Sequence, residues 1–481
     1  MKGRFFKNIT YMSFGTFFKL FVAFISTAIY IRTIGFEGYA IIGIVFSFFG
    51  LVSRFDIPYF LSLLKYNSNH FNNKRHYEST FNTLYTSVLF SNVLFFLFLL
   101  PFVLFLSKAV YNDPNLIIFY VIALFVFLFS RVDEFLKDFI RANQQETIIQ
   151  RATVVSLTSE FLITLFLLFI LNFGVLSIFI GAFIAKFLEF SLLCYFTKNR
   201  LIQYRPYFSF NLLVKVFKKC TIPNYFSNLL GALIFSGGLF VSTIFLDTTS
   251  IGILTIFVSI SGKLREILAP VWFHLAPIYT QLAIQKNFAK IKIVMKHTVF
   301  LFIIMFIILI VFLSVGEPLY LLYLGSQLDG TYFAFLLLLS SQLFAFIFVN
   351  VTGSYIFATN IKLFVKINFI SAIVFFLHLF PLIQIYGLIG AVVSFFIVHC
   401  LRGGVLLAYF WRMCGKKLDK GDMVAIMISL ISLAACLLMV YSGVTLNPSL
   451  AAISFVIVLC LIIMPYARKI KKSVCYIASE I

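Results

Sequence analysis

The side chains with the clearest chemical potential are charged groups that interrupt long apolar stretches of the chain. Lysine and arginine there could hold an anion, because the guanidinium fork matches phosphate oxygens and an ammonium adds a point charge. Aspartate and glutamate there could carry a proton or a sodium ion. The candidate anion-binding residues are Lys19, Arg54, Lys263, Arg265, Arg131, Lys186 and Arg402, and the candidate ion-coupling residues are Asp56, Glu160, Glu189 and Glu266.

The composition places these charges inside a membrane. Of the 481 residues, 62% are hydrophobic and 11% are charged, whereas soluble proteins contain about 45–50% apolar and about 25% charged residues. A soluble enzyme and a disordered chain are both excluded. The 38 Lys and Arg residues outnumber the 17 Asp and Glu residues, giving a net charge of +21. A nucleic-acid partner is not expected, because so apolar a chain lacks a soluble basic surface.

The apolar segments predict an all-α polytopic membrane protein with fourteen transmembrane helices. A helix needs about 20 apolar residues to cross the hydrocarbon core, and a spanning backbone must satisfy its own hydrogen bonds. A β-barrel is excluded because segments such as 301–313 do not alternate in polarity. The predicted spans are about 8–34, 39–64, 82–107, 115–140, 152–172, 174–197, 221–246, 251–280, 298–324, 331–357, 364–385, 387–411, 422–442 and 449–467.

The positions of the cations predict the orientation. With the N-terminus in the cytoplasm, nearly all cations outside the spans fall in cytoplasmic segments, and Lys108 is the one in an outer loop. Because cytoplasmic loops are enriched in Lys and Arg, we expect a multi-pass protein of the bacterial inner membrane with both termini cytoplasmic. The longest cytoplasmic loop, about 198–220, interleaves apolar and basic residues in its second half, a pattern that suits a helix lying on anionic lipid as well as a plain basic loop.

A weak internal repeat predicts two lobes. Residues 41–47 resemble residues 253–259, about 212 positions later, and Gly174 and Gly387 are separated by a similar interval. The predicted domains are therefore an N-terminal lobe of spans one to six with its linker (1–220), a C-terminal lobe of spans seven to twelve (221–411), and spans thirteen and fourteen with the tail (412–481). An even number of spans per lobe predicts pseudo-two-fold symmetry around a central cavity, with a site between the lobes.

Four of the cations are hard to explain without such a cavity. An ionised group at the centre of a span costs about 2.5–3.5 kcal/mol, so it normally faces a cavity or a partner. These four fall at similar depth in spans one, two and eight: Lys19, Arg54, Lys263 and Arg265. The neighbouring Asp56 and Glu266 cannot neutralise all of them. The excess predicts a positive cavity for a phosphate or diphosphate headgroup.

Other charges have an equally good structural interpretation. Lys186 and Glu189 are three residues apart and could pair on one helix face, and Asp133 and Lys137 could do so at a spacing of four. No metal site, disulfide framework or cofactor is indicated, because the seven cysteines contain no CxxC pair. The outer loops, all under about ten residues, leave no room for a catalytic domain, so we expect no enzyme.

Several segments resemble a known family. Gly35-Phe-Glu-Gly-Tyr39, Arg54-Phe-Asp-Ile-Pro58, Tyr386-Gly-Leu-Ile-Gly-Ala391 and the fourteen predicted spans resemble the Wzx-type polysaccharide flippases. These belong to the polysaccharide transporter family of the multidrug/oligosaccharidyl-lipid/polysaccharide (MOP) exporter superfamily. The resemblance covers nearly the whole chain through loose motifs.

The resemblance implies a function in O-antigen, lipopolysaccharide or related polysaccharide biosynthesis. The family moves undecaprenyl-diphosphate-linked oligosaccharide repeat units across the inner membrane by alternating access. In the related lipid II flippases, cations on the first, second and eighth helices hold the diphosphate, and Lys19, Arg54 and Arg265 occupy similar places here. The implied partners are this substrate, membrane lipids, a polysaccharide polymerase and a chain-length regulator, with a proton or sodium ion as counter-ion.

Two other functions are compatible with a polytopic membrane protein. A multidrug cation antiporter of the same superfamily would favour carboxylates in spans one and seven, where this chain has none. An O-antigen polymerase would need a large external loop with catalytic polar residues. The sign of the buried charge therefore favours the flippase.

Overall fold

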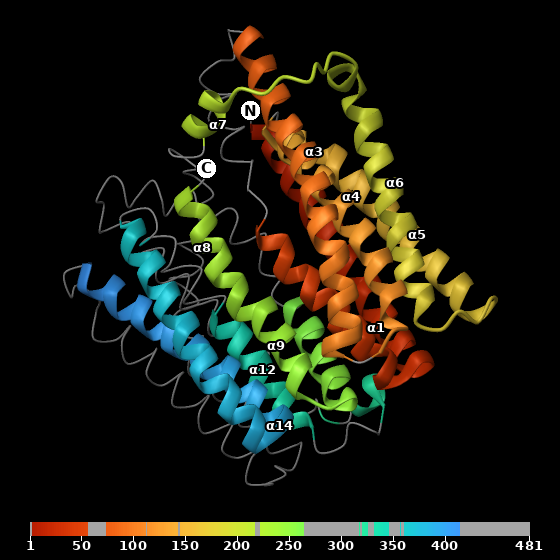
Figure 1. Ribbon diagram of the computed structural model, residues 1–481, viewed down its shortest axis with the longest axis vertical. Coiled ribbons are helices and arrows are strands. Elements are labelled where there is room, and N and C mark those ends of the chain that lie inside the picture. Colours follow the sequence, from red (N-terminus) through yellow and green to blue (C-terminus); the bar gives the residue numbers. More distant parts are fainter. Residues whose placement is uncertain are drawn as a thin grey trace. The chain divides into compact units, whose positions relative to one another are not determined.

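The fold consists of helices. The computed structural model describes residues 2–55, 74–111, 113–142, 145–216, 222–263, 317, 320–325, 331–345, 356 and 360–413. Every regular element among these residues is helical, which confirms the predicted all-α class (Figure 1). The elements are α1 (Lys2–Val52), η1 (Ser53–Phe55), α3 (Lys74–Phe105), η2 (Leu106–Val110), α4 (Leu116–Ala142), α5 (Glu146–Phe169), α6 (Leu176–Ile202), α7 (Phe210–Val216), α8 (Ile222–Ala232), η4 (Leu233–Gly237), α9 (Gly238–Phe245), α12 (Tyr332–Phe344) and α14 (Ile361–Met413).

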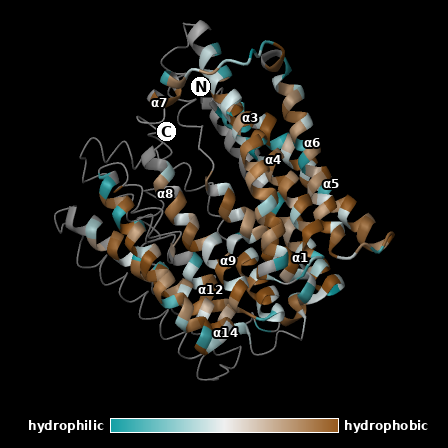
Figure 2. Ribbon diagram, in the orientation of Figure 1, coloured by the Kyte–Doolittle hydropathy of each residue, from teal (hydrophilic) through white to brown (hydrophobic). Residues whose placement is uncertain are grey.

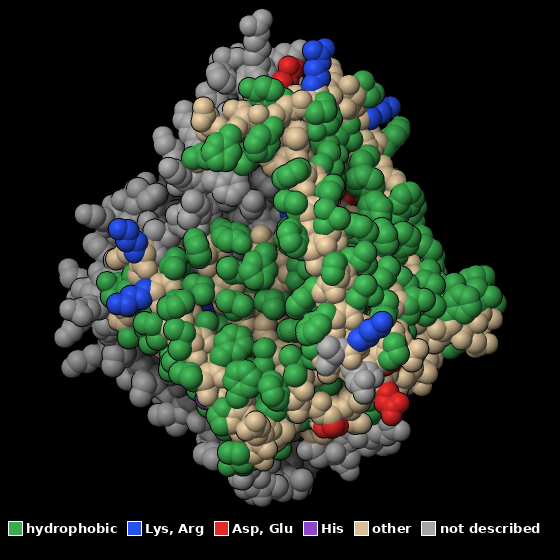
Figure 3. Space-filling view, in the orientation of Figure 1, with side chains coloured by type: hydrophobic (Ala, Val, Ile, Leu, Met, Phe, Trp, Pro, Cys, Tyr) green, Lys and Arg blue, Asp and Glu red, His purple; other side chains and the backbone are tan. Residues whose placement is uncertain are grey.

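The described helices are long and apolar enough to cross a membrane. Six such segments are found among the described residues: Phe18–Val52, Glu78–Lys108, Leu116–Arg141, Thr147–Phe169, Leu176–Lys198 and Lys362–Leu406. Their outer faces are apolar as well, as on α3, where Phe98 is 73% exposed (Figure 2). In Figure 3, hydrophobic side chains cover much of the described surface on the face in view. The chain is a polytopic membrane protein, because such surfaces match lipid rather than water.

Two long helices are each divided by one glycine. Within α1, Gly35 has φ 68° and ψ −174°, and within α14, Gly387 has φ 54° and ψ −128°. A positive φ is easily reached by glycine alone, so each helix is two helices joined by a sharp turn. These breaks confirm the predicted boundaries between spans one and two and between spans eleven and twelve. Gly174, predicted to correspond to Gly387, has the same φ of 54° between α5 and α6.

The described helices account for most of the predicted spans. Spans one to six correspond to α1 and α3–α6, span seven to α8, η4 and α9, span eight to the shorter apolar helix Thr248–Lys263, and span ten to α12. Spans thirteen and fourteen, and most of span nine, lie outside the described residues. The π-helical η4 ends at Gly237, so the helix pattern is interrupted where span seven contains two consecutive glycines.

The chain divides into two compact units. One comprises Met1–Pro270 and Asn368–Ala391, and the other comprises Val271–Ile367 and Val392–Ile481. In the first unit α5 packs on α6, α4 on α6, α3 on α4 and α1 on α5, and Figure 1 shows α3–α6 running side by side. The division into lobes at residues 220 and 411 stays a prediction.

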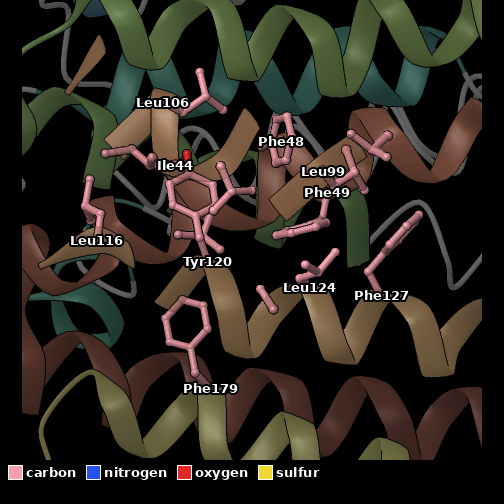
Figure 4. Packing of buried hydrophobic residues seen from close by; sticks show 14 of the residues in the cluster. Ile44, Phe48, Phe49, Leu99, Leu106, Leu116, Tyr120, Leu124, Phe127 and Phe179 are labelled. Atoms are coloured by element: carbon pink, nitrogen blue, oxygen red, sulfur yellow. The ribbon is translucent and has the colours of Figure 1, made fainter. Parts of the chain in front are cut away.

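Aromatic packing forms the core of the first unit. Phe48 and Phe49 of α1 contact Tyr120 of α4 with ring centroids 5.8 and 6.3 Å apart (Figure 4). The ring centroid of Phe179 of α6 lies 5.2 Å from that of Phe46. The cluster draws on α1, α3, α4, α6 and the helix Thr248–Lys263. It holds the second half of α1 in place, next to the turn at Gly35.

Glycines bring α1 close to the helix Thr248–Lys263. A Cβ on Gly252 would lie 2.2 Å from the carbonyl oxygen of Phe36, and a Cβ on Gly43 would lie 1.9 Å from the Thr255 hydroxyl. Small residues at such contacts let helix backbones approach in lipid, where apolar side chains have little preference for one another. This contact orients the helical segment that carries Lys263.

Asp247 begins the same helix. Its Oδ2 accepts a hydrogen bond from the backbone N–H of Ser250 at 3.0 Å, the arrangement of an N-cap. Hydrogen bonds from Ser250 hold the pKa of this carboxyl below its ordinary value. Asp247 therefore stabilises the start of the helix in its ionised form.

Replacing Gly252 by alanine should destabilise the protein, whereas Gly262→Ala should not. The new methyl group at residue 252 would meet a backbone oxygen that cannot turn aside, and overpacking of this kind costs about 1–3 kcal/mol. Gly262, on the same helix, has open space around it, so alanine there should be neutral or stabilising. Thermal unfolding of the purified protein in detergent measures both; equal melting temperatures would refute the close contact.

Asp247→Ala should lower stability by about 1 kcal/mol at neutral pH, the usual value of an N-cap. Because the folded-state pKa is lowered, the ionic contribution is complete above the ordinary aspartate pKa of ~3.9. It is lost as the pH falls through the lower, folded value. The melting-temperature difference from the native chain should thus shrink in strong acid. Asp247→Asn keeps a capping oxygen without the charge, so its deficit should be smaller at neutral pH and should also shrink in strong acid, as the native chain loses its charge.

Candidate functional site

A lysine of span eight reaches span one. The Nζ of Lys263 donates a hydrogen bond to the carbonyl oxygen of Ala23 in α1 at 3.4 Å. Lys19 lies one turn before Ala23 on the same helix, and its side chain is exposed. The side chain of Lys263 thereby reaches the turn of α1 that follows Lys19, although the two predicted anion-binding residues are far apart in sequence.

Glu160 of α5 interacts electrostatically with both of these lysines. Its electrostatic partners include Lys263 and Lys19, and also Lys186 of α6 and Glu189. The packing of α1 on α5 and of α5 on α6 brings these side chains together. Glu160 therefore links the two cations at α1 to the charges of α4 and α6.

A second group of charges lies between α4, α5 and α6. Glu189 of α6 contacts Lys186 Nζ at 2.7 Å and Lys137 Nζ of α4 at 2.9 Å, and it accepts a hydrogen bond from the Thr153 hydroxyl of α5 at 3.0 Å. The predicted pair of Lys186 and Glu189 is confirmed. Lys137 forms ion pairs with Glu189 and, at 3.5 Å, with Glu134, whereas its interaction with Asp133 is electrostatic only. Spacing along one helix missed a partner on another helix.

Arg131 is built into the bundle. Its guanidinium donates to Asn92 Oδ1 at 2.7 Å and to Ser91 Oγ at 2.9 Å, and it lies 4.3 Å from the centre of the Phe95 ring. The residue is 4% exposed. These contacts with α3 join two helices in lipid, which favours a structural role for this predicted anion-binding residue.

The remaining candidates are placed less fully. Arg402 is buried in the second unit, with buried His399 one turn earlier on α14. Arg54 lies in η1, and the structure describes its backbone. Asp56, Arg265 and Glu266 lie outside the described residues. Roles in substrate binding or ion coupling stay predictions for all of these residues.

No metal centre is found in the part of the chain that the structure describes, where no three His, Cys, Asp or Glu side chains are grouped as ligands. The described cysteines, Cys194 and Cys400, are free thiols. The charged groups can instead bind an anion, exchange a proton or hold the helices together.

The chain is similar to known proteins in its structure but not detectably in its sequence. No family model and no curated protein matches the sequence. Among solved structures, the lipid II flippase MurJ in an inward closed conformation matches with a TM-score of 0.73 and 16% identity, covering 95% of this chain and 99% of that one. An inward-facing multidrug-resistance MATE transporter of the MOP superfamily matches at 0.67 and 13%, covering 83% and 96%.

The chain has the fold of MOP-superfamily transporters. A third structure of this fold, a transporter from Pyrococcus furiosus described by the reversed polarity of its binding pocket, matches at 0.56 with 12% identity, over 86% of this chain and 97% of that one. These likenesses show the fold that the predicted superfamily implies. Identities this low leave the Wzx-type assignment a proposal.

Glu189→Gln should strongly destabilise the protein. The change leaves Lys137 and Lys186 without the carboxylate that both contact, and breaking a buried ion pair from one side costs about 3–5 kcal/mol. Glu134→Gln is the matched control, because Glu134 is largely exposed. Thermal unfolding in detergent should separate the two variants by several degrees. Adding Lys186→Met to Glu189→Gln should restore part of the loss; no recovery would contradict the shared ion pair.

Proposed function

We propose that the chain is a flippase for an anionic lipid-linked oligosaccharide. The substrate would be an undecaprenyl-diphosphate-linked repeat unit of O-antigen or a related polysaccharide, moved across the bacterial inner membrane by alternating access. The observation that carries the proposal is the hydrogen bond from Lys263 to Ala23. It places a cation of span eight one turn from Lys19 of span one, within apolar helices.

The chemistry of this place suits a diphosphate. An ammonium held in a low-dielectric environment attracts an anionic oxygen more strongly than it would in water. Lysine and arginine are the usual ligands of phosphate oxygens. Lys19 and Lys263 supply two positive charges, and Arg54 and Arg265 would add two more at similar depth in the predicted spans. A cationic drug would be repelled by the same groups.

The fold supports the same class of substrate. The structure of MurJ, a lipid II flippase, matches this chain over nearly the full length of both proteins. With the N-terminus cytoplasmic, export of an anion from a negative-inside cell gains about 2.3 kcal/mol per charge per 100 mV. A polysaccharide polymerase and a chain-length regulator would act on the exported unit, and a proton or sodium ion would serve as counter-ion.

A multidrug antiporter is the second candidate, because a MATE transporter shares the fold. It predicts a site that attracts cations and a chain that confers resistance to cationic dyes. Resistance that survives the loss of Lys19 and Lys263 would favour it over the flippase.

Lys263→Ala and Lys19→Ala should each abolish surface polysaccharide in a strain that depends on this chain. Both remove a positive charge from the proposed diphosphate site, and the same loss is expected for Arg54→Ala and Arg265→Ala. Lipid-linked repeat units should accumulate in the inner leaflet, as measured by lipid extraction and mass spectrometry. Lys263→Arg should keep partial activity if charge alone is needed.

Lys108→Ala is the matched control, because Lys108 is exposed at the end of η2 and should leave transport intact. Protein levels in the membrane must be equal across variants. Normal polysaccharide in both Lys263→Ala and Lys19→Ala would refute the proposed site.

A further inference from the structure

Asp133 of α4 is a buried carboxylate without a hydrogen bond. It is 0% exposed, and neither of its carboxylate oxygens has a hydrogen-bond partner. Its nearest cation is Lys186, whose Nζ lies 3.7 Å from Oδ2. An ionised carboxylate in such a place pays a desolvation cost that one distant ammonium does not fully offset.

The cations around Asp133 are engaged elsewhere. Glu189 contacts Lys186 at 2.7 Å and Lys137 at 2.9 Å, so both ammonium groups lie closer to Glu189 than Lys186 lies to Asp133. Thr153 also donates to Glu189 rather than to Asp133. Of the two buried carboxylates in this cluster, Glu189 has three close polar partners, whereas Asp133 has no hydrogen bond.

The other groups that act on Asp133 do not change this picture. From α4 these are Glu134, which adds negative charge, and Lys137; from α6 they are Lys186, Glu189 and the thiol of Cys194. On α3, Tyr85 interacts with Cys194, and on α5, Glu160 interacts with Lys186 and Glu189. The ammonium groups make the position unsuitable for a metal cation.

We propose that Asp133 is a reversible proton-binding site, with Lys186 as a counter-ion that it shares with Glu189. Binding converts the carboxylate to a neutral carboxylic acid, and the proton comes from water. Lys186 provides the route, because its side chain is 27% exposed while it contacts both carboxylates. The proton and Lys186 thus compete for Asp133.

The charge of Asp133 can act on the proposed diphosphate site. Lys186 interacts with Glu160 as well as with Asp133, and Glu160 interacts with Lys19 and Lys263. When Asp133 is protonated, Lys186 loses one of its carboxylate partners and interacts more strongly with the others, Glu160 among them, which weakens the hold of Glu160 on the two cations of the site. This role in transport rests on the proposed function, whereas proton binding itself does not.

Infrared difference spectroscopy tests the proton site directly. The purified full-length protein, in lipid bilayers and labelled with ¹³C-aspartate, is stepped between about pH 5 and about pH 8, where exposed carboxylates stay ionised. A carboxylic-acid C=O band that responds to the label should appear and disappear. It should be absent in Asp133→Asn, which mimics the neutral form and should fold, and unchanged in the control Glu134→Gln. An identical band in Asp133→Asn would overturn the proposal.

Lys186→Gln tests the shared counter-ion. It removes the cation that lies 3.7 Å from Asp133, so the C=O band should persist to higher pH than in the native chain. A midpoint that does not move would overturn the role of Lys186.

A transport assay separates this inference from the proposed function. Flipping of a lipid-linked diphosphate oligosaccharide in proteoliposomes should respond to an imposed pH gradient in the native chain and in Glu134→Gln, but not in Asp133→Asn. A native chain that flips no such lipid refutes the proposed function and leaves the C=O band as it was. Equal gradient dependence in all three overturns the coupling of Asp133 to transport.

Discussion

The arrangement of this protein depends on the few contacts that distinguish one apolar helix from another. In lipid, an exposed leucine or phenylalanine gains little by moving from acyl chains to a neighbouring helix. Position is therefore set by close backbone contacts and by polar groups that must find partners. Gly252 against the Phe36 carbonyl, and Arg131 against Ser91 and Asn92, are contacts of these two kinds. The many aromatic rings fill the remaining space.

Buried charges in this chain have two different tasks. Arg131, Lys137 and Glu189 satisfy one another or nearby polar groups and join α3, α4, α5 and α6. Lys263 donates a hydrogen bond to Ala23 of α1, one turn from Lys19. Glu160 and Lys186 connect the two groups electrostatically. A change of charge in the first group can therefore be felt in the second without a change in helix packing.

Sequence reasoning reached the helices and their turns but not the partners of most side chains. Apolar length predicted the spans, and glycine at residues 35 and 387 marked the sharp turns because its backbone can reach positive φ. The pair of Lys186 and Glu189 followed from helical spacing. The contact of Lys137 with Glu189 did not, because it depends on how two helices are rotated about their axes. In so apolar a sequence, almost no pattern of residues predicts that rotation.

The carbonyl of Ala23 has one further property. It already accepts a hydrogen bond from the Thr27 hydroxyl at 2.8 Å, shorter than the 3.4 Å bond from Lys263. Withdrawal of the ammonium would thus leave this carbonyl with a hydrogen-bond partner. An anion that approaches Lys263 could therefore break the hydrogen bond between Lys263 and α1 at a small cost in free energy. The Nζ of Lys263 would then exchange the Ala23 carbonyl for an oxygen of the bound anion.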